Sequence, residues 1–113
     1  MPSKFELFYG KVEVGGISSA FCSDDTWHGN FRTAITSEQG PLQRRLCDFI
    51  GFCEEWNARC DRGENPDPAD FDRYSDVLTS GLWCTSAEDG VVAKIDAAPV
   101  FFPGGDVSWR GAG

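Results

Sequence analysis

The sequence predicts an α+β fold, with an antiparallel β-sheet of about five to seven short strands packed against two consecutive helices. Two observations predict this class. Apolar and polar residues alternate towards both ends of the chain, as in strands, whereas the middle third carries apolar residues at helical spacing. Because helices and strands are segregated along the chain, an antiparallel sheet is favoured over a parallel βαβ arrangement.

The composition indicates a folded chain. Of the 113 residues, 41% are hydrophobic and 13% aromatic, which is far above the content of a disordered acidic segment despite the net charge of −8. No repeat or linker divides the sequence, so we expect one domain over residues 1–113, with Gly111–Gly113 as a frayed tail.

The first strands are predicted from alternation and from glycines. Phe5, Leu7 and Tyr9 alternate with polar residues, which indicates a strand over 4–14 with a bend at Gly10. Glycine accepts the positive φ of hairpin turns, so the pair at 15–16 predicts a turn. The pattern then predicts a strand over 17–21, a polar loop over 23–30 and a short strand over 31–35.

The first predicted helix covers about 41–60. Pro41 suits a first helical turn, where its missing N–H is not needed. One apolar stripe at 3.6-residue spacing follows and predicts the buried face: Leu42, Leu46, Phe49, Ile50, Cys53, Trp56 and Cys60.

The second predicted helix covers about 68–80. Asp67 is a typical N-cap, Pro68 suits the first helical position, and Gly81 is a typical C-terminal cap. Its expected buried residues are Phe71, Tyr74, Ser75 and Leu78. Tight turns at 89–90 and 103–106 then separate the remaining predicted strands, over 82–85, 91–96, 100–102 and 107–109.

The cysteines favour a reducing compartment. They are odd in number, and their spacing matches neither a disulfide framework nor the paired ligands of zinc. The first residues lack the pattern of a secretory signal, and no apolar run reaches the length that crosses a bilayer. We therefore expect a cytoplasmic protein with no metal, no cofactor and no membrane contact, in which Cys53 and Cys60 are buried and Cys47 is exposed.

Charge points to a basic partner. With ten basic and eighteen acidic residues, the field of the protein repels phosphate backbones, so nucleic acid is disfavoured as a ligand. Eight acids fall between residues 54 and 76, and helix capping accounts for only some of them. The others include the candidates for docking a basic protein: Glu54, Glu55, Asp72 and Asp76. The alternative is a solvated face that only keeps the protein soluble.

A second group of candidates lies around the only histidine. Asp24, Asp25, Trp27 and His28 combine two carboxylates, an indole and an imidazole within five residues, which are parts of acid–base or ligand-binding chemistry. The alternative is a turn in which aspartate caps backbone N–H groups. For the segment from Val100 to Trp109, two arrangements also stay open. Its aromatic side chains form an exposed rim around a turn, or every second residue is buried as in an ordinary strand.

Three small residues lie opposite the core stripe of the first predicted helix. Cys47, Gly51 and Ala58 would let another backbone approach closely, either the second helix or a terminal strand of this chain, or a partner helix, for example in a homodimer. Glycine inside a helix costs about 1 kcal/mol relative to alanine, which makes Gly51 the notable member.

No motif of a known catalytic mechanism occurs, which argues against an enzyme. The expected function is that of a small acidic bacterial protein that binds or inhibits a basic partner, as an immunity protein blocks a toxin. Two alternatives stay open. One is a small enzyme or ligand-binding domain that uses the Asp24–His28 loop, and the other is a structural subunit of an assembly.

Overall fold

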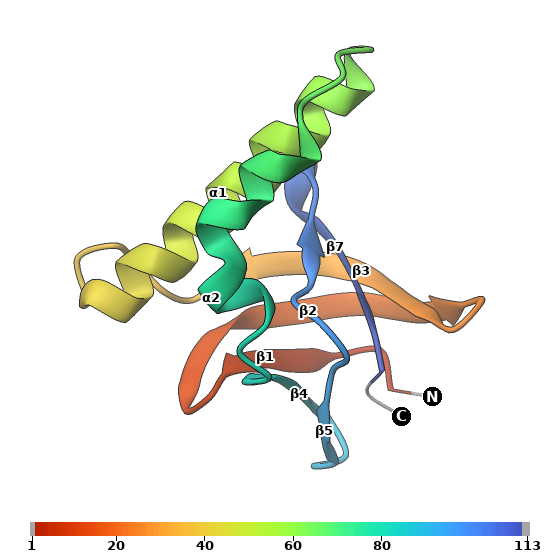
Figure 1. Ribbon diagram of the computed structural model, residues 1–113. Coiled ribbons are helices and arrows are strands. Elements are labelled where there is room, and N and C mark those ends of the chain that lie inside the picture. Colours follow the sequence, from red (N-terminus) through yellow and green to blue (C-terminus); the bar gives the residue numbers. More distant parts are fainter. Residues whose placement is uncertain (1, 112–113) are drawn as a thin grey trace.

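The computed structural model describes residues 2–111 and has the predicted α+β class. Seven strands form one curled antiparallel sheet in the order β5-β4-β1-β2-β3-β7-β6. Figure 1 shows the helical segments on one side of this sheet. The strands are β1 (Phe5–Tyr9), β2 (Val12–Ser23), β3 (Thr26–Thr33), β4 (Trp83–Ala87), β5 (Val92–Lys94), β6 (Val100–Phe101) and β7 (Asp106–Arg110).

The segment after β5 draws two distant strands together. Ile95 forms a bridge with Gly111, and the backbone N–H of Asp96 donates to the carbonyl of Arg110 at 3.1 Å. Strands β5 and β7 are five places apart in the sheet, so this contact holds the sheet in its curled shape. The predicted frayed tail is therefore wrong at Gly111, which is paired, while Ala112 and Gly113 lie outside the described residues.

The glycines of the first hairpin have other roles than predicted. The turn is at Gly10, with φ +60°, between Tyr9 and Val12, so the expected single bent strand is two paired strands. Gly15 and Gly16 lie inside β2 instead of forming a turn. The lack of a side chain at Gly15 is needed for space, because a Cβ atom there would lie 2.6 Å from the Phe31 ring.

The second hairpin shortens the predicted polar loop to a tight turn. Strand β2 continues to Ser23 and β3 begins at Thr26, so only Asp24 and Asp25 form the turn. Most of the expected loop over 23–30 is strand, because Thr26–Thr33 pairs with β2 on one side and with β7 on the other. An irregularity between Ser18 and Phe21, with Ser19 at φ 54°, lets β2 and β3 stay paired along their length.

Both turn residues adopt left-handed backbone conformations. Asp24 has φ 52° and Asp25 has φ 64°, the conformation of a two-residue type I′ turn, in which Asn-Gly is preferred. We expect the double variant Asp24→Asn, Asp25→Gly to raise the free energy of unfolding by about 1 kcal/mol, since left-handed residues other than glycine are strained. Thermal unfolding should show a midpoint several degrees higher, and a midpoint at or below the wild-type value would contradict this account of the turn.

Helix α1 spans Pro41–Asp61, close to its predicted bounds. Leu46, Phe49, Ile50 and Cys53 are buried, as the apolar stripe indicates. The stripe fails at its two ends, where Leu42 is 39% exposed and Cys60 is exposed. The reason is spatial, because the sheet faces the middle of this long helix and the stripe continues past it (Figure 1).

The second helical segment is not one continuous α-helix. It is a 3₁₀ helix, η1 (Pro68–Tyr74), followed by the single turn α2 (Ser75–Leu78). The carboxylate of Asp67 accepts from the N–H of Ala69 at 3.0 Å, which confirms the predicted cap. Ser75 is exposed and Val77 is buried, contrary to the prediction for Ser75, because the change from 3₁₀ to α geometry rotates the following side chains.

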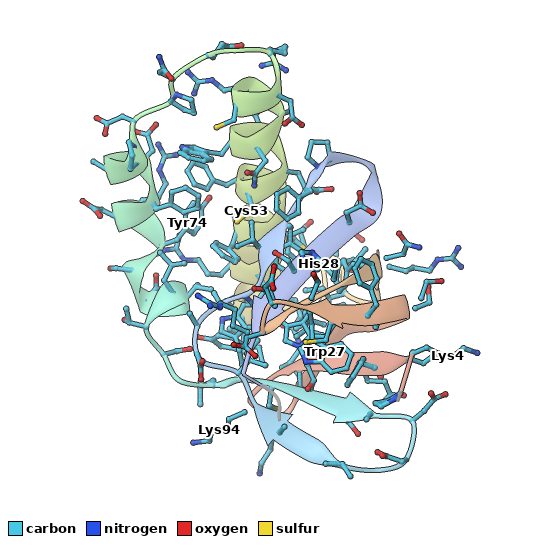
Figure 2. All side chains as sticks on the ribbon, turned by 90° about the vertical axis from the view of Figure 1, so that its right-hand side faces the viewer. Lys4, Trp27, His28, Cys53, Tyr74 and Lys94 are labelled. Atoms are coloured by element: carbon cyan, nitrogen blue, oxygen red, sulfur yellow. The ribbon has the colours of Figure 1, made fainter. Side chains whose placement is uncertain are left out.

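Aromatic side chains join this segment to α1. Phe52 lies 4.9 Å from both Phe71 and Tyr74, measured between ring centroids, and Trp56 lies 5.0 Å from Phe71. Figure 2 shows Tyr74 between the two helical segments, where its hydroxyl donates to the carbonyl of Asp48 at 3.3 Å. These contacts give the short segment its position, because a few residues of 3₁₀ helix are not stable alone.

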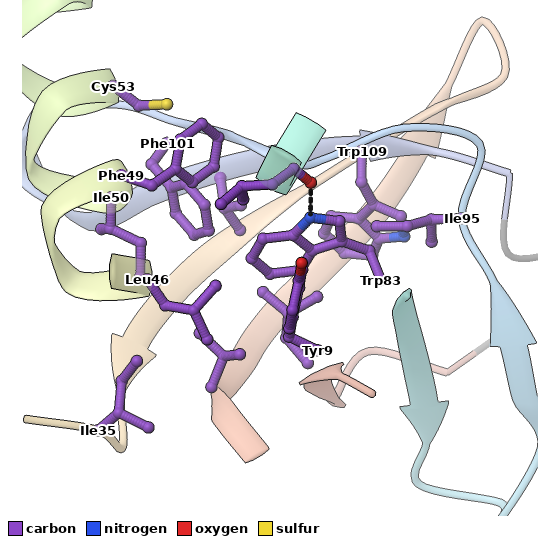
Figure 3. Close-up of a cluster of buried hydrophobic side chains, with 14 of the residues drawn as sticks. Tyr9, Ile35, Leu46, Phe49, Ile50, Cys53, Trp83, Ile95, Phe101 and Trp109 are labelled. Carbon is purple, nitrogen blue, oxygen red and sulfur yellow. Dashed lines mark hydrogen bonds between the residues drawn. The ribbon is translucent and has the colours of Figure 1, made fainter. Parts of the chain in front are cut away.

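Trp83 lies at the centre of the core between the sheet and α1. Its ring centroid is 5.0 Å from that of Tyr9 and 6.2 Å from that of Phe49. The indole Nε1 donates to the carbonyl of Val77 at 3.0 Å, the dashed line in Figure 3, so its one polar group is satisfied. Trp83 therefore links the sheet, α1 and α2.

Candidate functional site

The β2–β3 hairpin separates the four candidate residues around the histidine. Asp24 and Asp25 are exposed at its tip. Trp27 and His28 are neighbours in β3, so their side chains leave the strand on opposite faces. The Trp27 ring stacks on Trp109 with centroids 5.9 Å apart, whereas the His28 ring stacks on Phe21 at 5.2 Å. Trp27 and His28 are both labelled in Figure 2.

The register of the strands places His28 in a row of side chains that crosses four neighbouring strands. His28 lies opposite Phe21 of β2 and opposite Ser108 of β7, and Ser108 lies opposite Val100 of β6. Neighbouring strands are about 4.8 Å apart, so the row is roughly 15 Å long. Phe21 is 57% exposed and Val100 is 42% exposed, which places apolar surface in solvent at both ends of the row.

A shallow groove of about 680 Å³ lies beside the Phe21–His28 half of this row, whereas Ser108 and Val100 line a different cleft. In the next row on this face of the sheet, Asn30 lies opposite Asp106, and the backbone N–H of Phe102 donates to the carbonyl of Asp106 at 2.8 Å. Asp61, the last residue of α1, also lines the groove. We call this surface the His28 face and define it by Phe21, His28, Asn30, Asp61, Phe102 and Asp106.

A larger cleft of about 890 Å³ lies next to Trp27. Asp25, Asp96 and Arg110 bring two carboxylates and one guanidinium to its lining. We call it the Trp27 cleft and define it by Cys22, Asp25, Thr26, Trp27, Asp96, Ala97, Ala98, Val100, Ser108, Trp109, Arg110 and Gly111.

The Trp27 cleft also has an unsatisfied donor in its wall. Trp109 is 3% exposed, and its Nε1 has no hydrogen-bond partner among the atoms that the structure describes. Such a buried donor costs about 1–3 kcal/mol. Sequence reasoning missed Asp96 and Arg110, because the bridge between the end of β5 and the end of β7 brings them beside the hairpin.

The acidic candidates on the helical segments differ in their pairing. Asp76 accepts from Arg45 at 2.7 Å, and this hydrogen bond holds the pKa of the Asp76 carboxyl below its usual value. Glu55 lies 3.3 Å from Arg62. Glu54 and Asp72 form no ion pair with any residue in the range 2–111. The four candidates are therefore not equally available to a partner.

A small network of ion pairs lies at the C-terminal end of α1. Arg62 lies 2.9 Å from Glu64, and Arg59 lies 3.1 Å from the other oxygen of the same carboxylate. The hydrogen bond from Arg62 is the main reason that the pKa of Glu64 is lowered. These pairs are exposed to solvent, which screens them, so each contributes little to the stability of the fold.

The small-residue face of α1 is partly open. Gly51 is exposed, and a Cβ atom there would meet nothing within 4 Å, so the second helical segment does not pack on it. Ala58 and Cys47 are half-buried. Cys47 is thus less exposed than predicted, since its Sγ lies 3.9 Å from the carbonyl of Ile35.

The cysteines differ widely in exposure. Cys22 and Cys60 are exposed, so the prediction that Cys60 is buried is wrong. Burial raises the pKa of the Cys53 thiol to about 12, which keeps it protonated and unreactive near neutral pH. Burial also raises the pKa of Cys47.

The described residues contain neither a cluster of metal ligands nor a helix that could span a membrane. Within residues 2–111, no three histidine, cysteine or acidic side chains come together as metal ligands would. The same part of the chain has no helix with the length and apolar character needed to span a bilayer.

Comparisons of the chain with protein-family models, with curated protein sequences and with solved structures find no match.

Proposed function

We propose that the protein is a protein-binding module that docks a basic partner, in the manner of an immunity protein that blocks a toxin such as a nuclease. One observation supports this proposal. Of the eighteen acidic residues, only Glu55, Glu64 and Asp76 form ion pairs with the described cations. The remaining carboxylates form no ion pair within residues 2–111, so the surface attracts positive charge and accelerates encounter with a basic protein.

The proposal predicts binding that weakens with salt. A pull-down from a lysate of the native host at low salt should recover a basic protein. The recovery should fall at ~0.5 M salt, where the Debye length is only a few Å. Recovery that does not change with salt, or recovery of acidic proteins only, would contradict it.

Two variants that change the charge in opposite directions test the electrostatic attraction directly. Glu54→Gln removes an unpaired negative charge, so it should slow association with the captured partner at low salt. Lys94→Gln removes a positive charge and should speed association. Stopped-flow mixing measures both rates, and changes of the same sign in the two variants would rule out electrostatic steering.

The Trp27 cleft supports a second candidate function, the binding of a small ligand. Its volume of about 890 Å³ falls within the range of small-molecule sites, and Asp25 and Arg110 supply opposite charges at its lining. Asp25 lines this cleft and His28 does not, so the two residues give different predictions. Asp25→Ala should weaken the binding of a ligand that is detected by its effect on tryptophan fluorescence, and His28→Ala should leave this binding unchanged.

A further inference from the structure

We propose that the His28 face is the surface on which the basic partner docks. The occupant is an extended segment of the partner that carries arginine or lysine two residues away from an apolar side chain, so that both side chains point to the same face of the segment. This inference rests on the proposed function and assigns it to one surface. The apolar side chain would pack against Phe21 and Phe102, while the cationic side chains would reach Asp61 and Asp106.

The shape of the face suits an extended segment. The groove runs from Phe21 of β2 past His28 of β3 to Asp106 of β7, so it crosses three strands. Three strands span about 10 Å, which is the length of about three extended residues. Exposed apolar surface with a polar rim is the usual composition of a protein interface.

The charge of the face selects a basic occupant. Asp61 and Asp106 line the groove, and Asp24 and Asp25 lie at the tip of the adjoining hairpin. No lysine or arginine is among the described residues that line the groove. A guanidinium can pair with a carboxylate and stack on an aromatic ring at the same time, so arginine fits the Phe21–His28 stack better than lysine does.

The other exposed apolar residues lack this combination. Val91 and Val92 are the most exposed, but Lys94 follows them in the short strand β5. A basic segment would be repelled there. Val92→Ala is therefore a matched control for Phe21→Ala, since both variants remove exposed apolar surface from a strand of the same sheet.

The test uses a synthetic peptide of about six residues in which arginine and valine take turns at every second position, with serine between them, so that both face the groove and the peptide is long enough to cross three strands. A second peptide with glutamate in place of arginine is the charge control. Backbone amide NMR of the full chain should show the arginine peptide shifting residues of the His28 face: Phe21, His28, Asn30, Asp61, Phe102 and Asp106. Fluorescence anisotropy then gives the affinity of each variant.

We expect Phe21→Ala to weaken binding of the arginine peptide about tenfold, and the pair Asp61→Asn, Asp106→Asn to weaken it by a similar factor. Val92→Ala should stay within about twofold. Phe21 and both aspartates are exposed, so these variants should keep the fold, which their thermal unfolding verifies.

Three results would overturn the inference, and they separate it from the proposed function. Shifts that map to the helical segments or to the Trp27 cleft, with no effect of Phe21→Ala, would move the docking surface but keep a basic partner. Equal binding of the glutamate peptide would remove charge selection from both proposals. No binding of either peptide at millimolar concentration would exclude the His28 face as a docking surface for basic segments, while the charge-variant kinetics with the captured partner would still decide the proposed function.

Discussion

Trp83→Ala should lower the free energy of unfolding by about 4 kcal/mol, the usual cost of removing a buried tryptophan. Trp83 is 2% exposed, and its ring contacts Tyr9, Phe49 and Phe101 at centroid distances of 5.0, 6.2 and 6.4 Å. The substitution therefore leaves a cavity where the sheet meets α1. It also removes the hydrogen bond from the indole to the carbonyl of Val77, which then keeps only the longer one from the Ser80 hydroxyl at 3.4 Å. Urea unfolding followed by circular dichroism measures the change.

Trp83→Phe separates the two contributions. Phenylalanine keeps most of the ring contacts and loses the hydrogen bond to Val77, so we expect a loss of about 1–2 kcal/mol. This variant should fold even if the alanine variant does not. Leu82→Ala is the control, because Leu82 is next in the chain and 48% exposed. A loss at Trp83→Ala no larger than that at Leu82→Ala would show that Trp83 is not at the centre of the core.

The class of the fold and helix α1 could be predicted because their signals are local. Apolar residues at helical spacing over some twenty residues are incompatible with a strand, and Pro41 marks the first turn of the helix. The bounds of α1 were therefore close, but Leu42 and Cys60, at the two ends of the stripe, are exposed, and Trp56 is only half-buried. Which part of a long amphipathic helix meets a sheet depends on the position of the sheet, and the apolar pattern alone does not contain it.

The strands near the N-terminus were harder because glycine has two uses in a sheet. Glycine permits a turn, which was predicted at Gly15-Gly16, and it also permits close approach of another chain segment, which is its role at Gly15. The sequence does not distinguish these uses. Likewise, Thr26–Thr33 reads as a loop because its polar side chains are common, yet β3 pairs on both sides with β2 and β7.

The candidate site could be predicted only in part. Trp27 and His28 were noted from their residue types, but a loop was expected, and only a strand places them on opposite faces. The partners of His28 in its row, Ser108 and Val100, are far away in the sequence and are found only from strand register. The pairing of Asp76 with Arg45 likewise joins two helical segments and leaves no local signal.

Gly15→Ala should lower the free energy of unfolding by about 3 kcal/mol, at the upper end of the cost of overpacking. A Cβ atom at this position would lie 2.6 Å from one atom of the Phe31 ring and 2.7 Å from another, and it would also meet the carbonyl oxygen of Arg32. The oxygen belongs to the backbone of β3, which is paired with β2, so it cannot move without breaking the strand pairing. The ring of Phe31 is held as well, since it packs on Phe101 at 5.0 Å.

The adjacent residue provides a matched control in the same strand. A Cβ atom at Gly16 would meet nothing within 4 Å, so Gly16→Ala removes conformational freedom from the unfolded chain without a clash. It should raise the free energy of unfolding by about 0.4–1 kcal/mol. Urea unfolding of the two variants tests the account directly, because a hairpin turn at 15–16 would make both substitutions costly. Strand pairing around Gly15 instead predicts opposite signs, and equal losses in the two variants would mean that these glycines form a turn after all.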